Sequence, residues 1–313
     1  MSNSNPNPIS YERAQKAFQR ARSKALLRGV WMALQRRPNQ LLPYNEVREK
    51  ARAGGPVYQG LQAVPIRQIV GSVNRYRDFD RAFLPAQDFT EERWKSIGRA
   101  YYDHVYLPPV KLYKVGDVYF VVDGNHRVSV ARQLGQEFID AEVQECRVSV
   151  PLTPDIDPDD LEVIGEQAEF MERTRLAETR PDIPIRATIP GGYHLLLEHI
   201  EVHRYLQSQE WKREFGFEEA AAQWADQVYL PIVTVVRETG ILDDFPGRTE
   251  ADLYLWLMDH LYFLRQRFGN RVDIRRAARN FAQHFTERTL KRVWNWLSYH
   301  LLGRGSAESV PTE

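Results

Sequence analysis

The sequence predicts an α+β protein, in which a mixed strand-and-helix module is followed by a mainly α-helical domain. Short apolar runs alternate with helical segments over residues 64–146. The Pro- and Asp-rich stretch "PLTPDIDPDD" at 151–160 ends this pattern, and beyond it the apolar spacing is chiefly helical. A long basic helix at residues 11–37 is predicted ahead of both parts.

We therefore expect four parts along the chain. They are an N-terminal basic helical arm and linker (1–55), the mixed module (56–150), the mainly helical domain (151–303) and a disordered tail (304–313). Within the arm, "RAGGPVYQG" at 52–60 is interpreted as the linker, because it carries two adjacent glycines and a proline.

The elements of the mixed module follow from apolar spacing and turn residues. Thr90 is placed to cap a helix, Gly116-Asp117 to turn a hairpin, and Gly135 to end the following helix. The predicted elements are a strand at 64–70, a helix at 89–105, hairpin strands at 108–115 and 118–123, a helix at 126–135 and a strand at 138–148. In the second half, helices are predicted at 191–215, 217–240, 249–268 and 275–302.

Composition limits the class of protein. The 43% hydrophobic content suits a buried core, and Cys146, the only cysteine, excludes an internal disulfide and an all-cysteine metal site. The first twenty residues lack the apolar core of a secretory signal, and no apolar run reaches the roughly 18 residues of a membrane span. We therefore expect a cytoplasmic protein without a transmembrane segment.

The zero net charge conceals an uneven distribution. Residues 1–55 carry eleven Lys/Arg against three acids, and residues 261–313 carry ten against four. The acidic excess lies at 151–260, with nine bases and twenty-three acids. The basic ends either bind phosphate backbones such as DNA or fold back on the acidic middle. The basic helix is accordingly either a packing helix with a solvated face or an arm for nucleic acid or an anionic surface.

The stretch "VVDGNHRVSVARQLG" at 121–135 contains the strongest candidates for ligand-binding and catalytic residues. A strand ending at Asp123-Gly124 and followed at once by a helix leaves unpaired N–H groups that favour an anion. Gly124 would let a phosphate approach the main chain, and His126 and Arg127 would add donors. Asp123 is a candidate base or metal ligand. The alternative is an ordinary turn with polar surface residues.

The order of "VPIRQIVGSVNRYRDFD", "FTEERWKSI", "LPPVKLYKVGDVYFVVDGNHRVSVARQLG" and "FIDAEVQE" resembles the ParB/sulfiredoxin superfamily over residues 60–147. This resemblance implies that 56–150 is a nucleotide-binding module, with Gly124 and Arg127 at a phosphate-binding helix start. Asn125 stands where a sulfiredoxin has its catalytic cysteine, and Cys146 lies on the last predicted strand, so sulfiredoxin chemistry is not expected. The helical half resembles an uncharacterised bacterial domain found beside ParB-like modules.

The loop "GSVNRYRDFD" occupies the place where the superfamily often contributes a polar, arginine-bearing loop to its nucleotide site. Ser72, Arg75 and Arg77 are candidate phosphate contacts, and Asp78 and Asp80 are candidate metal ligands. The competing interpretation is a solvated loop whose Arg and Asp side chains pair with one another. The full set of candidate residues comprises catalytic Asp123 and His126, cofactor-binding Gly124, Asn125, His126, Arg127, Ser72, Arg75 and Arg77, and metal-binding Asp78 and Asp80.

Three functions are carried forward from these expectations. The first is a nucleotide-dependent regulator or DNA-associated protein that binds ATP or CTP with Mg²⁺ and forms a homodimer. The second is a small-molecule kinase or phosphotransferase of the free-serine-kinase type, and the third is a non-catalytic scaffold. If the protein is an enzyme, Mg-dependent NTP hydrolysis or phosphoryl transfer is the expected reaction class.

Three features of the helical half stand out, and two of them have two interpretations. His194, His199 and His203 either bind zinc or pack at an interface, with packing favoured because no third ligand is evident from the spacing. In "FPGRTEADLYLW", Thr249 and Asp252 form a capping-box-like arrangement. The bases and aromatics of "LKRVWNWLSYHLL" suit nucleic acid or a membrane surface, although core packing is the plainer account.

Overall fold

A computed structural model describes residues 8–35, 38–268, 274, 275, 277, 278 and 281. Its contacts divide the chain into two compact units, residues 1–169 and 170–313. This division lies later than the boundary expected at 150, because residues 150–168 bury Leu152, Leu161 and Ile164 against the first unit's sheet. The basic arm also belongs to the first unit rather than forming a separate part.

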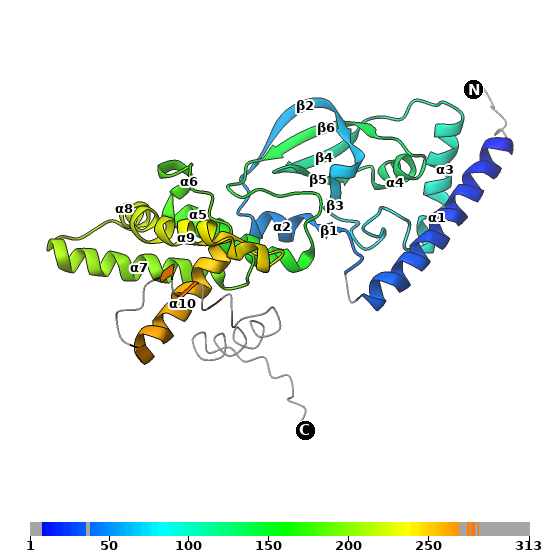
Figure 1. Ribbon diagram of the computed structural model, residues 1–313. Helices are drawn as coiled ribbons and strands as arrows, with labels where there is room; N and C mark the ends of the chain where they lie inside the picture. Colours follow the sequence, from blue (N-terminus) through cyan, green and yellow to red (C-terminus); the bar gives the residue numbers. More distant parts are fainter. Residues whose placement is uncertain (1–7, 36–37, 269–273, 276, 279–280, 282–313) are drawn as a thin grey trace, which may run out of the picture. The chain divides into compact units, whose positions relative to one another are not determined.

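The first unit is an α+β structure, as the sequence predicts (Figure 1). Its elements are α1 (Pro8–Leu34), β1 (Leu42–Pro43), α2 (Tyr44–Lys50), β2 (Pro56–Pro65), β3 (Ile69–Ser72), α3 (Glu91–Tyr102), β4 (Val110–Val115), β5 (Val118–Asp123), α4 (Asn125–Gln133), β6 (Phe138–Cys146) and the start of α5 (Leu161–Thr174). Among the described residues, the strands form one six-stranded sheet in the order β1-β3-β5-β4-β6-β2. The sheet is mixed: β1–β3, β3–β5 and β4–β6 are parallel, whereas β4–β5 and β6–β2 are antiparallel.

Several predicted elements are confirmed and two are corrected. The hairpin of β4 and β5, the helices α3 and α4 and the strand β6 lie where the apolar spacing places them. The linker expected at 52–60 is wrong from Pro56 onward, because these residues begin β2 and pair with the end of β6. The strand expected at 64–70 is also wrong in part, since Ile66–Gln68 forms a 3₁₀ turn and β3 starts only at Ile69.

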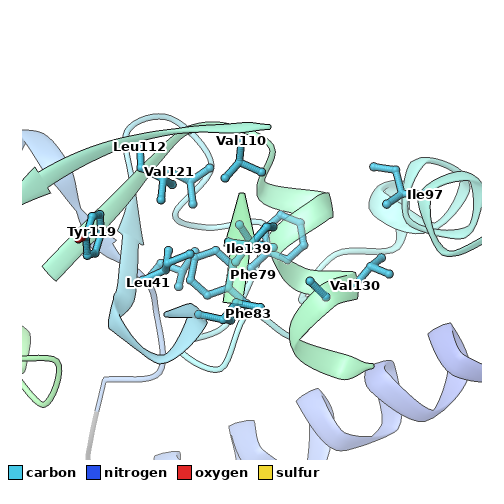
Figure 2. Close-up of a cluster of buried hydrophobic side chains, with 14 of the residues drawn as sticks. Leu41, Phe79, Phe83, Ile97, Val110, Leu112, Tyr119, Val121, Val130 and Ile139 are labelled. Atoms are coloured by element: carbon cyan, nitrogen blue, oxygen red, sulfur yellow. The ribbon is translucent and has the colours of Figure 1, made fainter. Parts of the chain in front are cut away.

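Apolar side chains fill both faces of the sheet, because neighbouring strand residues point to opposite sides. In β5, Tyr119 and Val121 face one core, and Val118 and Phe120 face the other. Figure 2 shows part of the first core, where strand residues meet Ile97 of α3, Val130 of α4 and Phe83 of the loop before α3. This packing fixes the position of α4 over the sheet.

The long helix α1 packs along α3 through small and aromatic residues. Ala14 of α1 packs against Gly98 of α3, where a Cβ would lie 3.4 Å from the Cβ of Ala14. The rings of Phe18 and Trp94 meet edge to face with centroids 5.6 Å apart. The buried positions Ala14, Phe18, Ala21 and Ala25 are four, three and four residues apart, so they lie on one face of the helix.

In the described part of the second unit, every regular element is a helix. Its elements are the end of α5, α6 (Leu176–Thr179), α7 (Gly192–Trp211), α8 (Phe217–Trp224), a π-helical turn at Ala225–Tyr229, α9 (Leu230–Thr239), a 3₁₀ turn at Ile241–Asp244 and α10 (Glu250–Phe268). Most of the helix expected at 275–302, with its aromatic and basic residues, and the tail expected at 304–313 lie outside the described residues. Within the described ranges, every helix is too short or too polar to cross a bilayer.

Candidate functional site

The candidate site lies at the turn between the end of β5 and the start of α4. Gly124 takes a left-handed conformation with φ of 106°, and a Cβ there would lie 2.6 Å from Cγ1 of Val110. The first helical bond runs from the N–H of Val128 to the carbonyl of Gly124 at 3.0 Å. The N–H groups of the three preceding residues therefore lie before the helix's own hydrogen bonding begins, at the positive end of its dipole. Such an end attracts an anion.

Arg127 is held inward at this turn. Its Nη1 donates to the carbonyl oxygens of Pro108 and Pro109, the latter at 2.9 Å, and its Nη2 donates to Oδ2 of Asp123 at 2.5 Å. The side chain is only 11% exposed, whereas that of Asp123 is 67% exposed. The guanidinium thus ties the loop before β4 to the start of α4. Its direct effect in this structure is to brace the turn.

Asn125 and His126 supply buried polar atoms at the same place. Oδ1 of Asn125 and Nδ1 of His126 are enclosed and have no hydrogen-bond partner among the described residues. The His126 ring meets Phe79 edge to face, with centroids 5.2 Å apart. Burial, together with the nearby charges of Arg75 and Arg93, lowers the pKa of His126 to about 4. The imidazole is therefore neutral at pH 7, with one ring nitrogen able to donate a hydrogen bond and the other able to accept one.

The loop after β3 brings part of its predicted set to this place. Arg75 acts electrostatically on His126, and its Nη1 bonds Oδ2 of Asp78 at 3.2 Å. Ser72 is fully buried: its Oγ donates to the carbonyl of Val121 at 3.2 Å and accepts from the N–H of Arg75 at 3.3 Å. Arg77 lies over the ring of Tyr76. Of the predicted phosphate contacts in this loop, Arg75 is the one that the structure brings beside His126.

The two carboxylates expected to hold a metal have different surroundings. Asp78 pairs with Arg75, whereas Asp80 is buried and accepts the N–H groups of Ala82 and Leu84 at 2.9 and 2.8 Å. Burial raises the pKa of Asp80. Within the described ranges, no group of three or more His, Cys, Asp or Glu side chains is placed to hold a metal ion. In this structure Asp78 is engaged by an arginine and Asp80 by two main-chain N–H groups.

Sequence reasoning missed two contributors to the site. The first is Arg93 on α3, whose positive charge helps to lower the pKa of His126. The second is the pair of carbonyl groups of Pro108 and Pro109, which accept hydrogen bonds from Arg127 and lie 19 and 18 positions before it in the sequence. No spacing rule links these positions to the turn, because the sheet and α3 bring them together. A cavity of about 400 Å³ lies instead at the other end of α4, where Arg132 and Gln136 face Ile66 and Phe138.

Most of the polar residues singled out in the second unit have structural partners. Nδ1 of His199 lies 2.9 Å from the hydroxyl of Tyr254, whereas His203 is buried and its Nε2 has no hydrogen-bond partner among the described residues. The predicted capping box is confirmed: the N–H of Thr249 donates to Oδ2 of Asp252 at 3.0 Å, and the N–H of Asp252 donates to Oγ1 of Thr249 at 3.3 Å. Arg248 donates to the hydroxyl of Thr188.

Comparison with known proteins adds two similarities. Residues 191–286 match the family described as "Domain of unknown function (DUF4032)", which starts at the residue before α7 and covers less than half of the chain. The crystal structure of sulfiredoxin from Arabidopsis thaliana is similar over 28% of this chain and 89% of that one, at 17% identity and a TM-score of 0.23. No curated protein matches the sequence.

Proposed function

We propose that the first unit binds the phosphate groups of a nucleotide at the start of α4. The observation that carries this proposal is a pair of enclosed polar atoms at the positive end of a helix, on Asn125 and His126, for which the described part of the chain supplies no hydrogen-bond partner. Leaving such atoms unpaired costs about 1–3 kcal/mol each. A ligand that bonds to them, through the imidazole N–H and a rotated amide NH₂, recovers this cost.

Charge supports an anionic ligand at this point. Arg75 and Arg93 are exposed side chains on two different elements, and both act on the same imidazole. Arg75 is held only by an exposed pairing with Asp78, which is weak and exchangeable. Arg127 fixes the turn that presents the N–H groups. In this proposal Arg75 and Arg93 contact the phosphates, and Arg127 positions the main chain.

Binding is the proposed activity, and the protein acts as a nucleotide-dependent regulator. This choice follows from the carboxylates, because Asp78 and Asp123 are paired with arginines and Asp80 is enclosed in its own turn. A phosphotransferase of the free-serine-kinase type is the competing function. It would require one of these carboxylates to leave its partner and act as a base or hold Mg²⁺.

The test is a thermal-shift screen of ATP, ADP, CTP and GTP, each with and without Mg²⁺. At a concentration of about 100 times Kd, a ligand specific to the folded state adds about 2.7 kcal/mol and raises the midpoint by several degrees. Arg75→Ala and Arg93→Ala should each reduce this shift, and Arg77→Ala, from the same loop as Arg75, should retain it. A screen in which no nucleotide moves the midpoint, or in which the first two variants respond as fully as the native chain, would refute the proposal.

Two further measurements separate the functions. Release of the terminal phosphate only when an acceptor metabolite is present would establish the phosphotransferase. Nucleotide-dependent, salt-sensitive retention on duplex DNA would establish a DNA-associated regulator.

A further inference from the structure

One face of α1 carries large apolar side chains that the folded unit leaves in solvent. Leu26, Leu27, Val30, Trp31 and Leu34 are each 60–76% exposed. Their spacing places Leu26, Val30 and Leu34 in one row and Leu27 and Trp31 in the adjacent row of the same helix face. We call these five residues the apolar stripe of α1. The packing against α3 uses Ala14, Phe18, Ala21 and Ala25, so the stripe contributes nothing to that contact.

Positive charge borders the stripe. Arg20 and Lys24 are exposed and lie two turns and one turn before Leu27 on the same side of the helix. Glu12 is the only acid in α1, and it is paired with Lys16. Arg36 and Arg37 follow the helix in the sequence. The stripe therefore lies within a basic surface, although the whole chain has no net charge.

The charges decide which occupant suits the stripe. A second copy of α1 would bring the same bases together, and the C-terminal segment 286–302, with three bases and one acid, is also positive. Nucleic acid would satisfy the bases but would leave five aliphatic and aromatic side chains in water. A helix with Trp and Leu on one face and Lys and Arg beside them is typical of helices that lie in a membrane interface. Anionic headgroups attract such bases.

We infer that the apolar stripe of α1 docks the protein on an anionic lipid bilayer. The helix lies along the surface, Trp31 and the leucines enter the boundary between headgroups and acyl chains, and Arg20 and Lys24 contact the headgroups. At 1.5 Å per residue its 27 residues span about 40 Å, enough for a peripheral contact through one face. This inference does not depend on the nucleotide proposal, since α1 and the start of α4 share no residue.

The experiment measures binding of the full chain to vesicles of phosphatidylcholine with and without phosphatidylserine. We expect binding to the anionic vesicles that weakens with salt. Trp31→Ser should lower the affinity about tenfold by removing apolar area, and Trp211→Ser, which removes an equally exposed tryptophan of α7, should not change it. Arg20→Gln should lower the affinity about fivefold, and Arg147→Gln, its control at an exposed site after β6, should leave it unchanged.

Five results would overturn the inference. The first is failure of the native chain to bind anionic vesicles, and the second is equal loss in a stripe variant and its control. The third is a fall in the melting temperature of several degrees on Trp31→Ser, because the tryptophan would then be covered by the protein's own chain. The fourth is a shift from dimer to monomer on Trp31→Ser, which would assign the stripe to a second copy. Binding to duplex DNA that depends on Arg20 and is indifferent to Trp31 would assign the surface to nucleic acid.

Discussion

His126 shows how one side chain can couple the candidate site to pH. Burial at the start of α4 lowers its pKa to about 4 from an ordinary value near 6.5, so the folded protein binds fewer protons than the unfolded chain between these values. Stability therefore falls as the pH drops through this window. The difference between these two pKa values corresponds to a loss of about 3 kcal/mol in the free energy of unfolding.

We predict that His126→Gln removes this part of the acid sensitivity. Urea unfolding gives the free energy of unfolding of the native chain and of the variant from pH 7 to pH 4. Over this range the native chain should lose about 3 kcal/mol more of its free energy of unfolding than the variant does. His199 and His203, whose pKa values burial also lowers, contribute equally to both proteins and cancel in the difference. A difference that stays constant over the whole range would show that the imidazole is not held neutral by the fold.

The residues of the candidate site differ in how far the sequence could predict them. The Asp-Gly turn followed by a basic helix is a local pattern, so Gly124 and its helix start were found. The partners of Arg127 cannot be predicted in this way, because the carbonyls that hold it belong to the loop before β4, 18 and 19 positions earlier in the sequence. The loop after β3 was interpreted either as a ligand site or as a paired loop, and the Arg75–Asp78 bond belongs to the second interpretation.

Among the elements, the predictable ones carry runs of buried apolar residues and the missed strand does not. The hairpin of β4 and β5 consists of two runs rich in buried apolar residues joined by a short turn, and this pattern identifies it without any tertiary information. By contrast, β2 is an edge strand whose ten residues are nearly all exposed, with a bulge between Tyr58 and Gly60. Its sequence has no apolar face to mark it, so only its pairing with β6 makes it a strand.

The junction between β5 and α4 yields a prediction at the same scale. We expect Gly124→Ala to destabilise the protein by about 2–4 kcal/mol, because a Cβ would strain the positive φ and overlap Val110 of β4. Gly135→Ala, at the other end of α4, is the matched control: its φ is 74°, but a Cβ there meets no atom within 4 Å, so only about 1 kcal/mol is expected. Equal losses in urea unfolding would mean that β4 does not pack tightly on the turn.

At the scale of the whole molecule, one buried carboxylate joins distant segments of the second unit. It belongs to Asp252, which is fully buried and accepts the N–H and hydroxyl of Thr188 at 2.8 and 2.6 Å and the N–H of Thr249 at 3.0 Å. The carboxylate joins the segment before α7 to the start of α10. The capping role was predictable from "TEAD", but the bonds to Thr188 span 64 residues and required the fold.

We predict that Asp252→Ala destabilises the second unit by about 3 kcal/mol, because three partly buried hydrogen bonds lose their fully buried, charged acceptor. The measurement is hydrogen exchange followed by peptide mass spectrometry. Amides of α7 and α10 should exchange faster by at least a hundredfold, and those of β4, β5 and β6 should keep their native rates, since the contacts of residues 1–169 form a separate compact unit. Equal acceleration in the sheet would show that the two units unfold together.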